Sequence, residues 1–253
     1  MVGLMKVVAS IQVRMGSGRF PGKVMKEVGE GRPLLGYLLD RLRLTSVLDQ
    51  IVVATSTRAE NDVIEEFCQS ESIPCFRGSE DDVLERTVEA LMSQKADVGV
   101  EVFGDCPLID PAIVNNMVTY FLENPGYDFV GNDLRTTYPP GMEVEVFLLD
   151  ALKDSHQRVS DPLIREHGTL FIRQNPDIYN LINLDAPSDL SRPEMELEVD
   201  TVEDFQVIKA VIEHFSTRKD YSLSEIIQFM DSDKTLARIN QGIPRRWREA
   251  RYE

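Results

Sequence analysis

The chain has 253 residues and carries 27 lysines and arginines against 43 aspartates and glutamates, a net charge of −16 at pH 7. With 42% hydrophobic and 28% charged residues it has the composition of a globular protein that is long enough to bury a full core. The negative charge argues against nucleic acid as a partner, and no apolar run of 18 residues or more is present to span a membrane.

Short apolar and β-branched runs predict the strands. The clearest lie at residues 6–13, 50–55, 96–103 and 143–149, with weaker candidates at 74–77 and 129–132. The first run resembles a short signal peptide but lacks an A-x-A-like cleavage site, so we interpret it as a buried strand. Three of the four clear runs are apolar on both faces, which is typical of a sheet covered by helices on both sides.

Amphipathic helical patterns alternate with these strands. They cover residues 33–47, 60–71, 81–94, 111–123, 201–215 and 222–230. Thr57 with Glu60 and Ser222 with Glu225 have the spacing of capping boxes. Because strand and helix alternate from residue 6 to about residue 123, the sequence predicts an α/β fold with a largely parallel sheet.

No linker, repeat or low-complexity tract divides the chain. We expect one α/β domain over residues 1–215 and a helical extension with a basic tail over residues 216–253, both in one globular unit. The three cysteines, Cys68, Cys75 and Cys106, are odd in number and form no CxxC pair. This argues against disulfides and structural zinc and favours a reduced, cytoplasmic protein.

The loop after the first strand is rich in glycine and basic residues. Its members are Arg14, Gly16, Gly18, Arg19, Gly22 and Lys23. Glycines let backbone N–H groups approach an oxyanion, and the basic side chains supply charge at the edge where open α/β sheets bind ligands. The spacing matches neither a Walker A loop nor G-x-G-x-x-G. We expect a polyphosphate-binding loop, with a flexible basic turn as the alternative.

Two aspartates follow apolar runs. Asp105 comes directly after the 96–103 run, and Asp200 lies between an apolar run and the 201–215 helix. Carboxylates at such positions can hold Mg²⁺ beside phosphate groups. For Asp200 a capping turn is an equally good interpretation. Asp110 and Thr201 are expected to be the N-caps of the helices that follow them.

Seven segments, in order, resemble the bacterial cytidylyltransferases that make CMP-activated sugars. They are IQVRMGSGRFPGK (11–23), IVVATS (51–56), FRGSEDDVLER (76–86), FGDCPLIDP (103–111), TYPPGMEVEVF (137–147), IREHGT (164–169) and LEVDTVEDF (197–205). The likeness is closest to the spore coat polysaccharide biosynthesis protein F branch, which is related to the acylneuraminate and 3-deoxy-manno-octulosonate cytidylyltransferases. Together the segments make the resemblance more specific than any single motif.

The resemblance implies a Rossmann-like nucleotide-diphospho-sugar transferase fold with a mixed, mostly parallel sheet and helices on both faces. It implies transfer of CMP from CTP to a sugar acid, of the 2-keto-3-deoxy or nonulosonic type, with release of pyrophosphate. Mg²⁺ is the implied cofactor, and surface polysaccharide or glycan biosynthesis the implied role. The relatives are commonly homodimers, and the apolar region around 143–149 would suit an interface.

The resemblance also assigns roles by position. The nucleotide-binding residues are Arg14, Met15, Gly16, Ser17, Gly18, Arg19, Lys23, Gly104 and Asp105, with Arg77, Gly78 and Ser79 near the base or ribose. The catalytic residues among them are Arg14, Arg19, Lys23 and Asp105, and the metal ligands are Asp105 and Asp200. The acceptor-facing residues are Glu143, Glu145, Arg165, Glu166 and His167. For Arg165 the alternative is an ion pair with a neighbouring acid, and His167 is as readily a structural histidine.

Four positions depart from the family pattern. Glu101 replaces an expected arginine, Pro140 an acidic residue, and Gly168 and Leu170 the usual valine and proline. These departures leave the acceptor and the base open, so a nucleotidyltransferase with another base or acceptor remains an alternative. A non-catalytic nucleotide-binding protein is a further alternative, against which the presence of Lys23, Asp105 and Asp200 argues.

The charge is unevenly distributed along the chain. The first 43 residues hold eight lysines and arginines against three acids, so a positive region surrounds the loop that suits a triphosphate. The basic tail from Arg245 to Arg251 packs either on the acidic body or on a second subunit, and the sequence does not decide between them.

Overall fold

A seven-stranded mixed sheet organises the chain in the computed structural model, which describes residues 5–29 and 31–245. Its strand order is β5-β4-β1-β6-β8-β7-β9. The strands are β1 (Val7–Gln12), β4 (Gln50–Ser56), β5 (Cys75–Gly78), β6 (Val98–Glu101), β7 (Phe129–Gly131), β8 (Glu145–Leu148) and β9 (Leu181–Asn183). The pairs β5–β4, β4–β1, β1–β6 and β7–β9 are parallel, and β8 runs antiparallel to both of its neighbours. The mostly parallel α/β fold predicted from the sequence is therefore confirmed.

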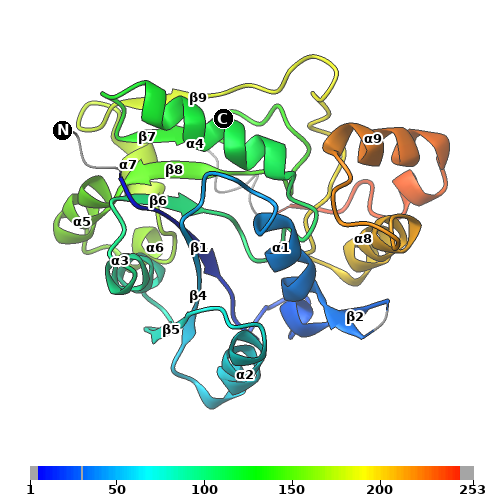
Figure 1. Cartoon of the computed structure of the whole chain (residues 1–253), viewed down its shortest axis with the longest axis horizontal. Coiled ribbons are helices and arrows are strands. Elements are labelled where there is room, and N and C mark those ends of the chain that lie inside the picture. Colours follow the sequence, from blue (N-terminus) through cyan, green and yellow to red (C-terminus); the bar gives the residue numbers. More distant parts are fainter. Residues whose placement is uncertain (1–4, 30, 246–253) are drawn as a thin grey trace.

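Alternate residues of β1 enter two different hydrophobic cores. Ala9 and Ile11 are fully buried on one face, and Val8 is fully buried on the other. The first core is covered by α1 (Leu34–Leu42), α2 (Asp62–Ser70), α4 (Pro111–Glu123), α8 (Val202–His214) and α9 (Leu223–Ser232). The second is covered by α3 (Val83–Ser93), α5 (Leu149–Arg158) and α7 (Leu170–Gln174). Figure 1 shows these helices on both faces of the sheet.

Helix starts follow the expected capping chemistry at three of four places. Asp110 caps α4, and Thr201 and Ser222 form capping boxes at the starts of α8 and α9. The capping box predicted at Thr57 and Glu60 is wrong. A 3-10 turn, η2 (Ala59–Asn61), precedes α2, and its last residue makes no side-chain cap because the Asn61 amide bonds Ser56 and the backbone of Met15 instead.

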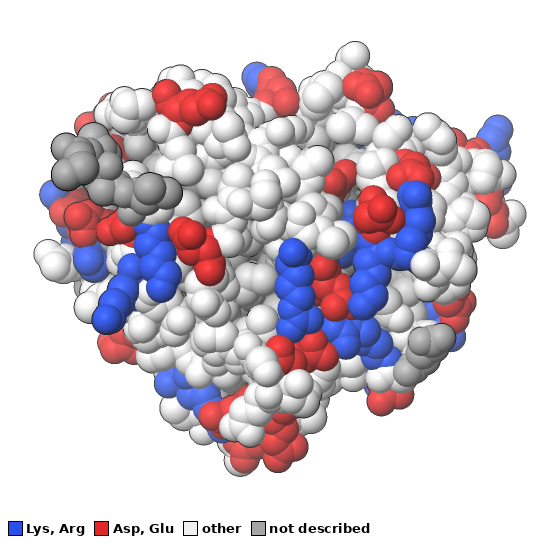
Figure 2. All heavy atoms as spheres, viewed as in Figure 1, with Lys and Arg blue, Asp and Glu red and all other residues white. Residues whose placement is uncertain are grey.

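Several short elements complete the fold. They are the 3-10 turns η1 (Lys23–Met25) and η3 (Leu236–Arg238), the hairpin of β2 (Glu27–Val28) and β3 (Arg32–Pro33), and the helix α6 (Pro162–Arg165). In the part of the chain that the structure describes, no helix is long and apolar enough to cross a membrane. On the face that Figure 2 shows, basic and acidic side chains are interleaved.

The region suggested for a dimer interface lies inside the molecule. β8 sits between β6 and β7, and Val144, Glu145, Val146 and Phe147 are completely buried. The apolar run at 143–149 is therefore a buried strand and not a surface, and this expectation is wrong.

Candidate active site

The ammonium group of Lys23 joins the two aspartates singled out in the sequence. Its Nζ donates to Asp105 Oδ2 at 2.8 Å, to Asp200 Oδ1 at 3.1 Å and to the carbonyl of Val199 at 2.6 Å. The side chain is only 10% exposed. Burial alone would lower the pKa of Lys23, but the charges of Asp105 and Asp200 outweigh it and raise the pKa, so the ammonium stays charged.

Local backbone geometry brings these three groups together. Lys23 opens η1 directly after Gly22, whose φ of 70° is in the left-handed region that glycine adopts without strain. On the other side, a Cβ added to Gly104 would lie 2.7 Å from the carbonyl oxygen of Gln12. Only glycine allows the turn after β6 to approach the end of β1 so closely, and this approach places Asp105 beside Lys23.

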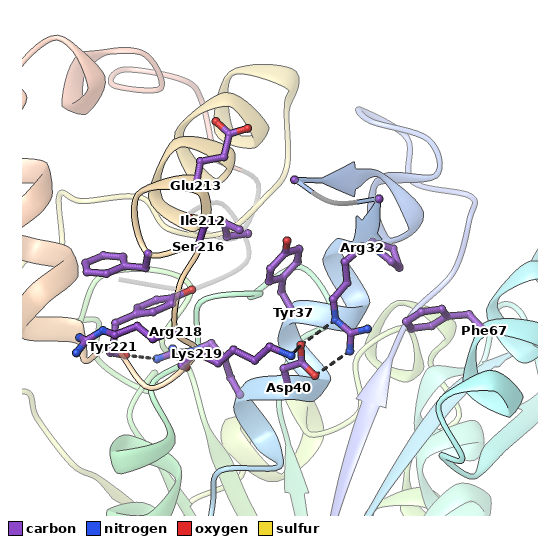
Figure 3. A pocket seen from close by; sticks show the side chains of 15 residues that line it. Arg32, Tyr37, Asp40, Phe67, Ile212, Glu213, Ser216, Arg218, Lys219 and Tyr221 are labelled. Atoms are coloured by element: carbon purple, nitrogen blue, oxygen red, sulfur yellow. Dashed lines mark hydrogen bonds and ion pairs between the residues drawn. The ribbon is translucent and has the colours of Figure 1, made fainter.

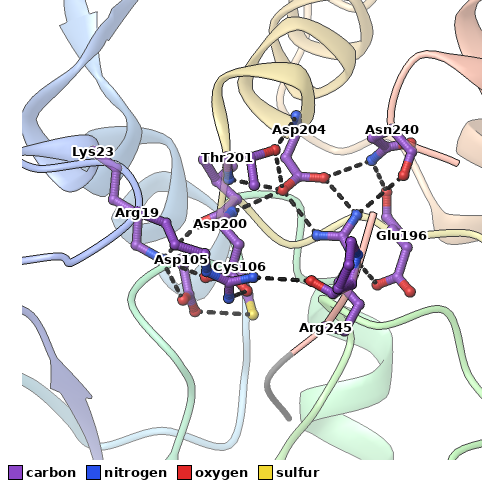
Figure 4. A network of polar contacts seen from close by, with 12 residues as sticks. Arg19, Lys23, Asp105, Cys106, Glu196, Asp200, Thr201, Asp204, Asn240 and Arg245 are labelled. Carbon is purple, nitrogen blue, oxygen red and sulfur yellow. Dashed lines mark hydrogen bonds and ion pairs between the residues drawn. The ribbon is translucent and has the colours of Figure 1, made fainter. Parts of the chain in front are cut away.

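Arg19 reaches the same cluster from the glycine-rich loop. Its guanidinium donates to Asp200 Oδ2 and, at 3.2 Å, to the carbonyl of Pro244 (Figure 4). Asp200 therefore contacts two basic residues of the loop, one through each carboxylate oxygen. The arrangement gathers Arg19, Lys23, Asp105 and Asp200, as the sequence predicted for a triphosphate and metal site.

Contacts with Asn61, Glu80 and Glu166 fix the rest of the loop at the carboxyl end of β1. The N–H of Met15 donates to Asn61 at 2.8 Å, and Arg14 forms an ion pair with Glu80 at 3.2 Å and a longer one with Glu166 at 3.8 Å. Among the described residues, none accepts a hydrogen bond from the backbone N–H of Gly16 or Gly18. These two N–H groups and the half-exposed Arg14 suit the oxygens of a phosphate chain.

The two aspartates have the donor chemistry that a divalent cation requires. Carboxylate oxygens of Asp105 and Asp200 converge on one ammonium, so the same oxygens are close enough to share a hard ion such as Mg²⁺. No third acid, cysteine or histidine of the described chain completes a preformed cluster with them. The pair fits an ion that takes one or two protein carboxylates and draws its other ligands from phosphate and water.

The residues assigned to the acceptor do not form a single wall. Glu145 is completely buried and accepts hydrogen bonds from Thr169 at 2.6 Å and Arg173 at 2.9 Å. Glu143 is also buried, and it accepts from the N–H of Gly141 at 2.7 Å. Of this group, only Glu166 and His167 are exposed. An acceptor role for Glu145 has no support in these contacts.

Arg165 and Arg77 are both occupied by protein groups. Arg165 donates to Asp82 at 2.7 Å and to the carbonyls of His156 and Val159, which ties α6 to α3 and α5. The ion pair with a neighbouring acid is the interpretation that these contacts favour. Arg77 is bound to acids of α2 and to the carbonyl of Ser56.

The turn after β5 approaches the loop through Glu80 and not through the residues assigned to the base or ribose. Gly78 ends β5, and the Ser79 hydroxyl accepts from the N–H of Asp82 at 3.1 Å. Glu80 meets Arg14, and the carbonyl of Ser79 accepts from Arg86 at 2.5 Å. The buried Arg86 also donates to Gln12 at 2.9 Å, so it fixes this turn to the end of β1.

Sequence reasoning missed residues that support the site. They are Asn61, Glu80, Arg86, Glu198, Asp204, Asn240 and Arg245. Glu198 is half-buried near the aspartates, and loss of solvent, with the charges of Asp105 and Glu143, raises its pKa. Four of these residues, Glu80, Arg86, Glu198 and Asp204, lie inside the matched segments, so an acid or arginine within a motif was a usable signal. Asn240 and Arg245 carried no such signal.

A cavity of about 400 Å³ lies between the β2–β3 hairpin, α1 and the end of α8 (Figure 3). None of the predicted site residues lines it. Its carboxylate Asp40 is already neutralised by Arg32 at 2.8 Å and Lys219 at 2.7 Å. The chemistry points to the Lys23 cluster, and we place the active site there.

Comparison with known proteins identifies the class. The model of the cytidylyltransferase family matches residues 8–241. The spore coat polysaccharide biosynthesis protein SpsF of Bacillus subtilis is 34% identical over 233 residues, which are 90% of this chain and 95% of that protein. The chain therefore belongs to the cytidylyltransferase family and is a nucleotidyltransferase.

Solved structures agree with this assignment. A cytidylyltransferase from Leptospira borgpetersenii superposes with a TM-score of 0.89 at 31% identity, covering 95% of this chain and all of the other. A CMP:2-keto-3-deoxy-manno-octonic acid synthetase complexed with CTP gives a TM-score of 0.63 at 17% identity, over 83% of this chain and 99% of the other. The second likeness supports the Rossmann-like fold alone.

Proposed function

We propose that the enzyme transfers CMP from CTP to a hydroxyl group of a sugar acid, of the 2-keto-3-deoxy or nonulosonic type, and releases pyrophosphate. The observation that carries this proposal is the buried ammonium of Lys23 between Asp105 and Asp200, beside a loop with two arginines and two available N–H groups. The likeness to SpsF supports a role in surface polysaccharide biosynthesis. The partial likeness to a 3-deoxy-manno-octulosonate cytidylyltransferase, 37% identical over 122 residues, supports the acceptor class.

In the proposed reaction the acceptor oxygen forms a bond to the α-phosphorus while the bond between that phosphorus and the pyrophosphate oxygen breaks. The acceptor hydroxyl loses its proton to solvent. Negative charge grows on the α-phosphate and on the leaving pyrophosphate, and Lys23, Arg19 and Arg14 offer preorganised positive charge to both. Positioning and electrostatics carry such a transfer, so no protein nucleophile is required.

Asp105 and Asp200 are the residues that would hold Mg²⁺. Bound there, the ion would supply a Lewis acid that polarises the α-phosphate and lowers the pKa of the acceptor hydroxyl. Lys23 donates to both carboxylates and holds them close together, and Arg19 orients Asp200. We further propose that the enzyme works in the cytoplasm, as its three free cysteines suggest, and that it forms a homodimer.

Pyrophosphate release tests the proposal. The wild-type enzyme is assayed with each of four nucleoside triphosphates, Mg²⁺ and a panel of sugar acids, and we expect turnover with CTP. Asp105→Asn removes one charge from the metal pair, so its rate should fall by a factor on the order of 10²–10³. Asp150→Asn, at an exposed acid on α5, is the control and should keep the wild-type rate.

The outcomes separate the alternatives. Turnover with a different nucleoside triphosphate would replace cytosine as the base, and turnover with a non-acidic acceptor would replace the sugar acid. Binding of CTP without turnover on any acceptor would favour a non-catalytic nucleotide-binding protein. A wild-type rate in Asp105→Asn, with an unchanged melting temperature, would remove Asp105 from the metal site.

A further inference from the structure

A closed ring of polar contacts links the glycine-rich loop to the C-terminal part of the described chain (Figure 4). Arg19 donates to Asp200 and to the carbonyl of Pro244. The N–H of Asp200 donates to Asp204 at 3.1 Å, and Asp204 accepts from Arg245, the neighbour of Pro244. The ring therefore joins two residues of the proposed triphosphate and metal site through residues more than 200 positions apart in the sequence.

Arg245 is almost completely buried in this ring, with its side chain 1% exposed. Its guanidinium donates two parallel hydrogen bonds to the Asp204 carboxylate, at 2.8 Å and 2.7 Å, and a longer one to the carbonyl of Asn240. Asn240 adds a bond to Asp204 at 2.8 Å. A bidentate arginine–carboxylate pair has a fixed geometry that lysine cannot reproduce, so it sets orientation as well as charge.

Asp204 transmits this orientation to Asp200. The same carboxylate oxygen that accepts from Arg245 also accepts from the N–H groups of Asp200 and Thr201, at 3.1 Å and 2.8 Å. Burial alone would raise the pKa of Asp204, but the bonds from Arg245 and Asn240 outweigh it and lower the pKa. A buried, ionised carboxylate therefore fixes the backbone from which the Asp200 side chain projects.

The C-terminal segment also contacts the loop directly. The Arg19 guanidinium lies between the Pro244 carbonyl and the Asp200 carboxylate, so a shift of Pro244 would move one of its two partners. Arg245 fixes the position of Pro244 because the two residues are consecutive. This segment thus acts on Arg19 through the backbone carbonyl of Pro244. It acts on Asp200 through the side chain of Arg245, by way of Asp204.

We propose that Arg245 is a positioning residue for the active site, which sets the placement of Arg19 and Asp200 toward the metal-bound triphosphate. This inference rests on the proposed function of that site. It gives the C-terminal extension a part in nucleotide binding through the placement of other residues. An active site that requires such geometry loses much of its affinity or rate on a displacement of about 1 Å.

Calorimetric titration with CTP, once with Mg²⁺ and once with EDTA, tests the inference on the full chain. We expect Arg245→Ala to weaken binding of CTP in the presence of Mg²⁺ by about tenfold or more, because Arg19 and Asp200 both lose their support. Arg245→Lys keeps the charge but not the two parallel bonds, and it should weaken binding by a smaller factor. Binding in EDTA should weaken less, since only the contribution of Arg19 is then measured.

Arg192→Ala is the matched control. Arg192 forms a second bidentate pair, with Asp231 of α9 at 2.7 Å and 2.9 Å, outside the ring. Its loss should leave CTP binding unchanged. If Arg245→Ala is unfolded by circular dichroism, Arg245→Lys decides the question. Wild-type affinity in the folded variant, even with a lower melting temperature, would overturn the inference and leave the proposed function intact. Failure of the wild-type enzyme to bind CTP would overturn both.

Discussion

At the scale of single residues, three buried acids, Glu101, Asp133 and Glu145, lie near one arginine, Arg173. Glu101 and Glu145 face each other across β6 and β8, and Arg173 contacts Glu145 at 2.9 Å and Asp133 at 3.0 Å. Burial raises the pKa of Glu101 to about 7, since it outweighs the lowering by Arg173 and Arg86, and Asp133 adds to the rise. The departure at position 101 thus introduces a carboxyl group that is protonated in mildly acidic solution.

The raised pKa of Glu101 predicts a pH-dependent stability. Its folded-state pKa lies above the ordinary 4.5, so its stabilising contribution is complete below that value and is lost as the pH rises through about 7. Urea unfolding from about pH 5 to about pH 8 should show a fall in the free energy of unfolding that is smaller in Glu101→Gln, which cannot ionise. Equal slopes in both proteins would show that Glu101 does not titrate in this range.

Two of the family departures have one structural cause. A Cβ added to Gly168 would lie 2.6 Å from Glu101 Oε2, so the valine expected at position 168 does not fit beside the glutamate present at 101. Glu101 fills the space that a side chain at 168 would occupy. The glutamate at position 101 therefore fits because position 168 is glycine.

This coupling predicts a non-additive pair of substitutions. Gly168→Val should lower the free energy of unfolding by about 1–3 kcal/mol, because it overpacks a buried site. In a Glu101→Ala background the same substitution should cost much less. Urea denaturation of both single variants and the double variant measures the coupling. Additive costs would show that the two side chains do not compete for the same space.

At the scale of elements, the parallel half of the sheet was predictable because its strands have enough apolar residues to show a pattern. β1 and β4 have six and seven residues, whereas β9 has three and each strand of the β2–β3 hairpin has two. Strands this short show no periodicity in the sequence, and whether they form depends on the neighbouring chain segments. The false capping box at Thr57 has a similar cause, since Asn61 is committed to the loop after β1.

The proposed active site was predictable where it lies at strand ends. Lys23 and Asp105 converge because β1 and β6 are neighbouring parallel strands whose carboxyl ends share one edge. Asp200 follows no strand and comes from the turn before α8. Glu145 was misplaced because sequence alone does not show that β8 enters the middle of the sheet in an antiparallel direction. The packing of the basic tail at Arg245 stayed undecided because no local sequence pattern identifies its partner on α8.

The capping boxes of α8 and α9 allow a matched test of whether a cap next to Asp200 affects activity as well as stability. Thr201→Ala and Ser222→Ala each remove the cap of a helix, so each should lower the free energy of unfolding by about 1 kcal/mol. Only Thr201 adjoins Asp200 and contacts Asp204 at 3.0 Å. We expect Thr201→Ala alone to reduce pyrophosphate release from CTP, by several-fold, in assays below both melting temperatures. Equal activity of the two variants would contradict this difference.

At the scale of the whole molecule, a positive loop is enclosed by acids from distant parts of the chain. Arg14, Arg19 and Lys23 meet Glu80, Asp105 and Asp200, so part of the charge of −16 neutralises the loop. The region after residue 215 belongs to this arrangement in space. The buried Arg41 of α1 donates to the carbonyls of Lys219 and Tyr221 at 2.9 Å and 2.8 Å, and Asp110 accepts from the N–H of Leu223 at 2.6 Å.

A chain that ends at residue 215 should therefore not fold as an independent domain. Truncation there removes two backbone acceptors of Arg41, which would be left with its charge poorly compensated in the interior. It also removes Phe229 and Tyr221, whose rings stack on His214 and Phe215 at the end of α8. We expect aggregation in gel filtration and no cooperative thermal transition, while the full-length chain shows one. A monomeric truncated protein that melts cooperatively near the full-length temperature would instead make residues 216–253 a separable appendage. In that case CTP binding by the truncated protein would show whether Arg19 and Asp200 hold their positions without the C-terminal segment.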